Sequence, residues 1–317
     1  MTKQKEVLDN PKYITVLDHG FVGLVDSMGS DSAIVDAARV SYGDGTKNIR
    51  ADRGLIRYLM SHRHTSPFEM CEIKLHLKMP IFVMRQWVRH RTASLNEYSG
   101  RYSVMSDEFY VPGMEMIAPQ ATDNKQGRSG AMSDKNKHGV QDLMEAAFDT
   151  SYSLYECLYK SAEEQGTDGK FDAPFGAYDD DGWLDAEFPG TAREIARNVL
   201  PVANYTELYW KQNLHNMFHL IKLRVDPHAQ AEIRAFAQAV YDLIKPLFPT
   251  AVEAFEDYVL EGATLSKMDL HLLRTLLASP GTQLNTMIDD AGSPAAFAET
   301  FGMTGRELGA FRTRFSV

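Results

Sequence analysis

Around Pro80 the chain changes abruptly from the hydrophobic period of a strand to that of a helix. Residues 72–79, EIKLHLKM, alternate strictly between polar and apolar side chains, which predicts a half-buried strand. Pro80 ends that strand, and residues 81–91 then repeat apolar side chains at helical spacing. The side chains expected to face the core of this helix are Phe82, Val83, Trp87 and Val88. The fold must therefore combine strands with helices.

The remaining elements follow from the same patterns. Residues 13–25 predict a strand, a glycine-containing turn (DHGF) and the start of a second strand. Helical spacing predicts helices over residues 31–42, 48–61, 140–164, 191–200, 205–224 and 228–247, with a polar loop over 118–139. Nine acidic residues and one lysine between residues 161 and 190 predict an acidic surface insertion at about 165–190. Three short helices are expected at 265–277, 294–301 and 305–311.

Charge and cysteine content exclude several classes of protein. Lys and Arg total 33 against 43 for Asp and Glu, so the net charge of −10 disfavours non-specific binding to nucleic acid or anionic lipid. No apolar run of about 18 residues occurs, and the first residues lack the apolar stretch of a signal peptide. Cys71 and Cys157 form neither a disulfide framework nor a CxxC motif. We therefore expect a cytoplasmic protein with no membrane partner.

The densest group of functional side chains is residues 85–102, RQWVRHRTASLNEYSGRY. On a helix, Arg85 and Arg89 lie four residues apart and can point to one side. Guanidinium groups donate paired hydrogen bonds that match phosphate and carboxylate, and Ser99-Gly100-Arg101 suits a second phosphate contact. The alternative is an ordinary solvated basic face of a helix, and the segment alone leaves both interpretations open.

Two further clusters carry functional residue types. Arg193 and Arg197 lie one helical turn apart, and Asn213, Leu220 and Arg224 share a helical stripe that can line a pocket. His215 and His219 have a spacing that zinc sites use, but no HExxH pattern accompanies them, so we expect no metal. The third cluster, HRHTSPFE at residues 62–69, is equally compatible with an ordinary turn.

Taken together, these segments resemble one known family. Residues 89–101 spell RHRxxSxNExSxR, which resembles the signature of the flavin-dependent thymidylate synthases at all eight fixed positions. HRHTSPFE at 62–69, REIARNVLP at 193–201 and LRVDPHAQAEIR at 223–234 resemble three further motifs of that family. Two positions depart from the pattern, since Ser66 replaces the usual Thr and Met70 replaces a His.

The resemblance implies a reaction and a fold. The reaction is the reductive methylation of dUMP to dTMP, with methylenetetrahydrofolate as carbon donor and FAD reduced by NADPH as hydride source. The implied fold is the α+β, ThyX-like fold, a central antiparallel sheet flanked by helices, in a homotetramer whose active sites are shared between subunits. Residues 1–260 would form this catalytic domain, and residues 261–317 a small all-helical C-terminal extension of unknown role. Nucleic acid is not an expected partner.

The resemblance also assigns roles to individual positions. Arg224 is the expected catalytic residue, a fixed cation at the uracil ring. The positions matched to dUMP binding are Gln86, Trp87, Val88, Arg89, Glu97, Tyr98, Ser99, Gly100, Arg101, Arg197 and Arg224. The positions matched to FAD binding are Ser66, Arg89, His90, Arg91, Glu97, Asn213, Leu214, His215 and His219. His64 and Tyr102 match positions near the flavin and the folate.

The sequence also bears on the choice of nucleophile and on two alternative functions. Cys71 and Cys157 both lie in apolar contexts, which favours a mechanism without a cysteine nucleophile, and Ser99 lacks a general base beside it in the sequence. A catalytically silent nucleotide- or RNA-binding member of the same fold is a second hypothesis, but the complete set of arginines argues against it. A metal-dependent hydrolase is a third, and too few carboxylates lie near the histidines to support it.

Overall fold

The computed structural model describes residues 10–40, 49–122, 127–165, 184, 187–268, 270–271, 274, 291–301 and 303–309. The chain divides into two compact units. Unit 1 comprises Met1–Ser41 and Thr65–Pro249, and unit 2 comprises Tyr42–His64 and Thr250–Val317. Nearly all of the acidic insertion predicted at 165–190 lies outside the described residues.

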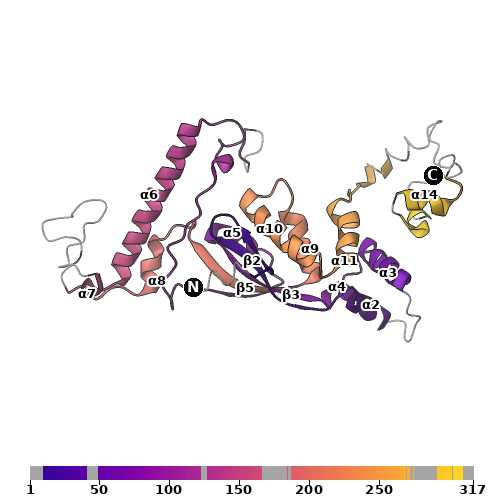
Figure 1. The fold of residues 1–317 in the computed structure, drawn as a ribbon, viewed down its shortest axis with the longest axis horizontal. Helices are drawn as coiled ribbons and strands as arrows, with labels where there is room; N and C mark the ends of the chain where they lie inside the picture. The colour runs from indigo at the N-terminus through magenta and orange to yellow at the C-terminus, as the bar shows by residue number, and fades with distance from the viewer. Residues whose placement is uncertain are drawn as a thin grey trace. The chain divides into compact units, whose positions relative to one another are not determined.

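Unit 1 contains a five-stranded antiparallel sheet with the strand order β1-β2-β3-β5-β4 (Figure 1). The strands are β1 (Tyr13–Val16), β2 (Gly20–Met28), β3 (Glu72–Pro80), β4 (Ser94–Glu97) and β5 (Tyr205–Asn213). The alternation that predicted β3 is confirmed, because Ile73, Leu75 and Leu77 are fully buried while Lys74 between them is exposed. With helices around this sheet, the predicted α+β fold is confirmed.

The helix predicted over residues 205–224 is wrong in its first half. Residues 205–213 form β5, which pairs with β3 on one side and β4 on the other, and only α9 (Leu214–Arg224) is helical. Buried Leu208 and Trp210 alternate with exposed Glu207 and Tyr209, which is the period of a strand. Aromatic residues and a threonine in this segment favour a strand, and pairing with two neighbours outweighs the helical spacing.

The helices of unit 1 differ from the predictions mainly at their ends. They are α2 (Asp31–Arg39), α4 (Ser66–Glu69), α5 (Ile81–Trp87), η2 (Met114–Met116), α6 (Asp134–Tyr159), α7 (Ala162–Gln165), α8 (Arg193–Ala196), η3 (Arg197–Val199), α9 and α10 (Ala231–Ile244). α6 begins inside the predicted loop 118–139, because Ser133 caps it by accepting a hydrogen bond from the Asn136 amide at 3.3 Å. The helix predicted at 191–200 is instead α8 followed by the 3₁₀ turn η3.

α5 also ends earlier than expected, at Trp87 rather than at residue 91. The amide of His90 donates to the Trp87 carbonyl at 3.1 Å, so the chain turns here and leads into β4. Arg89 therefore lies beyond the end of the helix and does not share a helical face with Arg85.

One apolar face of the sheet and the helices packed on it form the core of unit 1. α9 buries Met217, Phe218 and Leu220, and α10 lies so close to β2 that a side chain at Gly20 would meet the Phe236 ring at 2.8 Å. At the other side of unit 1, α6 stacks Phe148 on Phe109 at 5.1 Å. α6 thereby fixes the segment that follows the signature motif.

The secondary-structure elements described in unit 2 are all helices. It contains α3 (Ile49–Ser61), most of α11 (Pro249–Phe255), the π-helix η4 (Glu256–Leu260), α14 (Pro294–Thr300) and a helical turn at residues 305–309. Phe297, Ala298 and Leu308 form a small core. Within the three predicted C-terminal helices, residues 267, 268, 270, 271, 274, 294–300 and 305–309 are helical, residues 265, 266 and 301 are not, and residues 275–290 and 310–317 lie outside the described residues. The boundary at residue 260 between catalytic domain and extension stays a prediction.

None of the helices in the described ranges is both long enough and apolar enough to span a membrane.

Candidate active site

The signature segment runs from the end of α5 through β4 to the turn that follows. β4 is an exposed edge strand, and its Glu97 accepts a hydrogen bond from the Thr206 hydroxyl at 2.9 Å. Trp87 lies in the core with its side chain fully buried, whereas the guanidinium-bearing Arg89 and Arg91 are exposed. Buried Trp87 therefore anchors the segment in the core, while Arg89 and Arg91 are exposed to solvent.

A hydrogen-bonded pair joins this segment to the end of α9. Arg224 Nε donates to His90 Nε2 at 3.0 Å, and Arg224 Nη2 donates to the Gln86 carbonyl at 3.3 Å. Since Arg224 can only donate, His90 accepts at Nε2, and its ring proton is on Nδ1. His219 lies beside His90, with ring centroids 6.0 Å apart. Four residues predicted to belong to one site thus come together.

The His90 imidazole is neutral at physiological pH. Burial, then the charges of Arg224 and His219, lower the pKa of His90 to about 4. In the unfolded chain a histidine has a pKa of about 6.5, so the unfolded state binds more protons between these two values. The stability that His90 contributes is therefore complete above about pH 6.5 and is lost as the pH falls toward 4.

This lowered pKa predicts a specific acid sensitivity. Between pH 7.5 and pH 5 the free energy of unfolding should fall by about 2 kcal/mol through His90 alone. Urea unfolding of the wild-type protein and of His90→Gln at both pH values measures this difference, because glutamine offers an acceptor and does not titrate. An equal loss in the two proteins would contradict the assignment.

A second group forms around the turn after β4. Arg101 Nε donates to Glu194 Oε2 at 2.9 Å, and Arg193 Nη1 donates to the Tyr102 carbonyl at 3.4 Å. These contacts bring the residue 193–201 motif beside the signature motif. Gly100 is buried at their junction, where an added Cβ would lie 2.8 Å from Met105 Sδ and 3.3 Å from Arg197 Cδ. Arg101 and Arg197 are exposed, so their cationic groups are available to a ligand.

The start of α9 holds three of the predicted flavin positions. Asn213 caps the helix, and its Oδ1 accepts from the Asn216 amide at 2.9 Å. Leu214 is fully buried, and its amide donates to the Cys71 carbonyl at 2.9 Å, whereas His215 is half-buried. Ser66, at the start of α4, is exposed. His64, in contrast, belongs to unit 2.

One neighbour of the site was not predicted. Gln230 Oε1 accepts a hydrogen bond from Gln86 Nε2 at 2.6 Å, and it lines a cavity of about 640 Å³ at the start of α10 with Arg128, His228 and Arg234. The signal was present in the LRVDPHAQAEIR segment, which contains Gln230. Among the residues that the structure describes, no three His, Cys, Asp or Glu side chains gather in a group that could hold a metal ion.

Comparison with known proteins identifies the family. Residues 23–250 match the family model described as "Thymidylate synthase complementing protein". A flavin-dependent thymidylate synthase of Rickettsia bellii is 46% identical over 275 residues, which is 86% of this chain and 87% of that protein. One from Thermus thermophilus is 49% identical over 270 residues, which is 85% of this chain and 88% of that protein. The chain belongs to the flavin-dependent thymidylate synthase family.

A solved structure is similar to most of this member of the flavin-dependent thymidylate synthase family. The UMP/dUMP methylase PolB from Streptomyces cacaoi, bound with 5-Br UMP, has a TM-score of 0.61 and 32% sequence identity over 78% of this chain and 98% of that chain. The residues that match the family model include all four segments quoted above, so the resemblance seen in the sequence is confirmed. As a flavin-dependent thymidylate synthase the protein is an enzyme, a methyltransferase. The match to the family model ends before the C-terminal extension.

Proposed function

We propose that this enzyme converts dUMP to dTMP by reductive methylation, with methylenetetrahydrofolate as carbon donor and FAD reduced by NADPH as hydride source. The observation that carries the proposal is the fixed position of Arg224, held by His90 and the Gln86 carbonyl where two of the family motifs meet. The relatives are named flavin-dependent thymidylate synthases, and the PolB structures contain 5-Br UMP or 5-Br dUMP, which supports a uridine nucleotide as substrate.

The phosphate of dUMP is proposed to bind at the turn after β4. Arg101 and Arg197 are exposed and both lie next to buried Gly100, so two guanidinium groups and the backbone can approach one phosphate. Glu194 holds Arg101 in place until a phosphate competes for it. The full proposed set for dUMP remains Gln86, Trp87, Val88, Arg89, Glu97, Tyr98, Ser99, Gly100, Arg101, Arg197 and Arg224. Because the Trp87 side chain is buried, only its main chain is available to a ligand.

Gly100→Ala is expected to weaken dUMP binding about tenfold, because the methyl group would clash with buried Met105 and push against the Arg197 side chain. Isothermal titration of dUMP into the purified variant measures the change. Gly139→Ala is the matched control. Gly139 lies in helix α6, and a Cβ added there meets nothing within 4 Å, so this variant should bind dUMP as the wild-type protein does. Unchanged dUMP affinity in Gly100→Ala would place the phosphate elsewhere.

The uracil ring is proposed to lie at Arg224. Burial lowers the pKa of Arg224, but a guanidinium stays charged at neutral pH, so it can stabilise negative charge on the ring as it reacts. A cysteine nucleophile has no support in the structure, because Cys71 and Cys157 are buried and burial raises the pKa of both thiols. When bound and reduced by NADPH, FAD would supply the hydride that the methyl group requires.

The residues around α9 fit a flavin dinucleotide. A pyrophosphate needs cationic and N–H donors, and this region offers exposed Arg89, Arg91 and His219 with half-buried His215. Ser66, Arg89, His90, Arg91, Glu97, Asn213, Leu214, His215 and His219 are therefore the proposed FAD residues, with His64 and Tyr102 as proposed contacts of flavin or folate.

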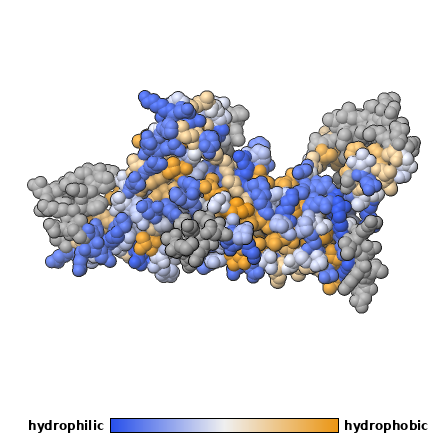
Figure 2. All heavy atoms as spheres, in the orientation of Figure 1, coloured by the Kyte–Doolittle hydropathy of each residue, from blue (hydrophilic) through white to orange (hydrophobic). Residues whose placement is uncertain are grey.

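A homotetramer with shared active sites is proposed as well, in the cytoplasm. Hydrophobic residues also reach the surface in Figure 2, and on the strands and turns near the site Leu95, Tyr98 and Tyr209 are 41%, 44% and 45% exposed. Such aromatic and aliphatic side chains beside unscreened arginines are typical of an interface that a second subunit completes.

The proposed reaction is tested by leaving out one reaction component at a time. Purified protein is incubated with dUMP, methylenetetrahydrofolate, NADPH and FAD, and dTMP is measured by chromatography when each component is left out in turn. We expect yellow protein after purification and, once the bound flavin has been removed, dTMP only in the complete mixture. Flavin bound without dTMP formation would contradict the proposed reaction, and a protein that cannot bind FAD would contradict the cofactor.

A further inference from the structure

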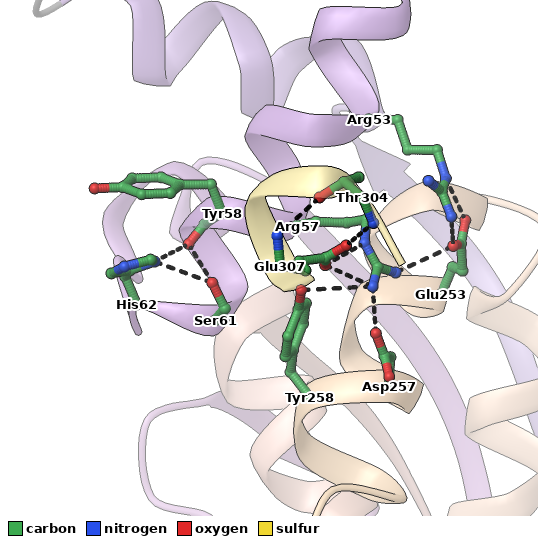
Figure 3. A network of polar contacts seen from close by, with 10 residues as sticks. All are labelled: Arg53, Arg57, Tyr58, Ser61, His62, Glu253, Asp257, Tyr258, Thr304 and Glu307. Atoms are coloured by element: carbon green, nitrogen blue, oxygen red, sulfur yellow. Dashed lines mark hydrogen bonds and ion pairs between the residues drawn. The ribbon is translucent and has the colours of Figure 1, made fainter. Parts of the chain in front are cut away.

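A buried arginine attaches the C-terminal extension to α3 within unit 2 (Figure 3). The Arg57 side chain is only 6% exposed, and its guanidinium contacts Glu307 Oε1 at 2.9 Å, Glu253 Oε1 at 3.2 Å and the carboxylate of Asp257. Arg53 forms a second ion pair with Glu253. Glu253, Asp257 and Glu307 are thus all paired with arginines of α3.

The turn that carries Glu307 is fixed from its other side too. The Thr304 amide donates to Glu307 Oε2 at 2.7 Å, and the Glu307 amide donates to Thr304 Oγ1 at 3.2 Å, which is a capping box. Leu308 packs with Phe297 and Ala298. The backbone at Arg306, between these anchors, is therefore held in place.

Arg306 lies against an aromatic and imidazole cluster at the end of α3. Its guanidinium carbon is 5.8 Å from the centroid of the Tyr58 ring. The Tyr58 ring is 4.1 Å from His62 and 5.8 Å from His64, measured between centroids. We call Tyr58, His62, His64 and Arg306 the Tyr58 cluster.

The Tyr58 cluster has a cation without a matching anion. Among the residues that the structure describes, neither Arg306 nor the neighbouring Arg63 pairs with a carboxylate, and both are exposed. His62 Nδ1 bonds to the Tyr58 carbonyl at 2.9 Å, which leaves Nε2 for another partner. Excess positive charge at a fixed, solvent-accessible position attracts an anionic ligand.

The backbone at this cluster is strained. Arg63, between the two histidines, has φ of +57°, a left-handed conformation that glycine normally provides at the end of a helix. The His64 amide donates to the Leu59 carbonyl at 2.9 Å, and this bond keeps the turn tight. Such strain in a residue other than glycine is concentrated at functional sites.

We propose that the Tyr58 cluster binds the anionic end of a co-substrate, a carboxylate or phosphate group, and that Arg306 of the C-terminal extension is its principal contact. The inference rests on the proposed function, because His64 is the cluster member expected near the reactants. Two co-substrates carry suitable groups, the glutamate tail of the folate and the phosphates of the pyridine nucleotide. The extension would then be a substrate-selecting part of the enzyme.

The test compares binding to FAD-loaded, full-length protein. Equilibrium dialysis measures the affinity of pteroylmonoglutamate, pteroylpentaglutamate, NADP⁺ and NAD⁺ for the wild-type protein, Arg306→Gln and Arg306→Lys. Lys267→Gln is the matched control, since it removes another exposed cation of the same extension. Arg306→Gln is expected to weaken one class of probe about five- to twentyfold, Arg306→Lys to restore most of the affinity, and Lys267→Gln to change it less than about twofold.

The pattern of loss identifies the ligand. A loss that is larger for the pentaglutamate supports the folate tail, and a loss for NADP⁺ alone supports the nucleotide 2′-phosphate. Equal losses for NADP⁺ and NAD⁺ support their shared pyrophosphate. Unchanged affinity for all four probes overturns the inference, even if the wild-type protein forms dTMP. A wild-type protein that forms no dTMP while Arg306→Gln still weakens probe binding would contradict only the proposed function.

Discussion

Arg224→Ala is expected to lower the rate of dTMP formation by about 10²–10³-fold, the usual effect of removing one preorganised group that stabilises developing charge. Arg224 is positioned by His90 and by the Gln86 carbonyl, so its charge is in place before the substrate binds. Arg224→Lys keeps the charge but loses the paired donors, and an intermediate rate is expected. Single-turnover measurements with saturating dUMP separate this loss from weaker binding.

The same variant has a second readout. Removing the Arg224 charge removes one cause of the lowered His90 pKa, so this pKa should rise in Arg224→Ala, as measured by NMR titration of the imidazole. A variant with unchanged dTMP formation would remove Arg224 from the mechanism. A lost rate with an unchanged His90 pKa would mean that the two side chains do not interact in solution.

Trp87→Ala is expected to lower the free energy of unfolding by about 3–5 kcal/mol, because it leaves a cavity in the core. The indole is fully buried and lies edge-on to Trp210, with centroids 5.5 Å apart. Trp87 is also the last residue of α5, so its loss should loosen the turn that holds His90 and Arg89 and should weaken flavin binding. Urea unfolding of the protein without flavin measures the stability.

Trp87→Phe is the matched control for that prediction. The indole nitrogen Nε1 has no hydrogen-bond partner among the described residues, so phenylalanine removes an unsatisfied donor and retains most of the apolar contact. A loss below about 1.5 kcal/mol is expected for this variant. If Trp87→Ala were no less stable than Trp87→Phe, the packing described for α5 would be wrong.

The sequence predicted most reliably what depends on local pattern. β3 follows from strict alternation, and the helix at 48–61 is confirmed as α3 over residues 49–61. Residue types marked the motifs around Arg101 and Arg197 as two separate clusters, and only the family resemblance assigned both to one site. Arg224 and His90 are 134 residues apart along the chain, and only the family resemblance joined them in advance.

The features that could not be predicted depend on contacts between residues far apart in the sequence. β5 has helical spacing in its apolar residues, and its identity as a strand requires β3 and β4 as partners. The end of α5 at Trp87 depends on the same sheet, since the chain must turn to pair β4 with β5. Likewise, nothing local to Arg57 indicates that it contacts Glu307, 250 residues away in the sequence.

The central claim is that the hydride of the methyl group comes from reduced flavin, without a cysteine nucleophile. The most direct test is to reduce the FAD-loaded protein with NADPH without oxygen, remove excess NADPH, and add dUMP with methylenetetrahydrofolate. The account predicts that the flavin spectrum returns to the oxidised form with one dTMP made per flavin, in the wild-type protein and in Cys71→Ala/Cys157→Ala alike. Formation of dTMP while the flavin stays reduced, or its loss in the cysteine variant, would contradict it.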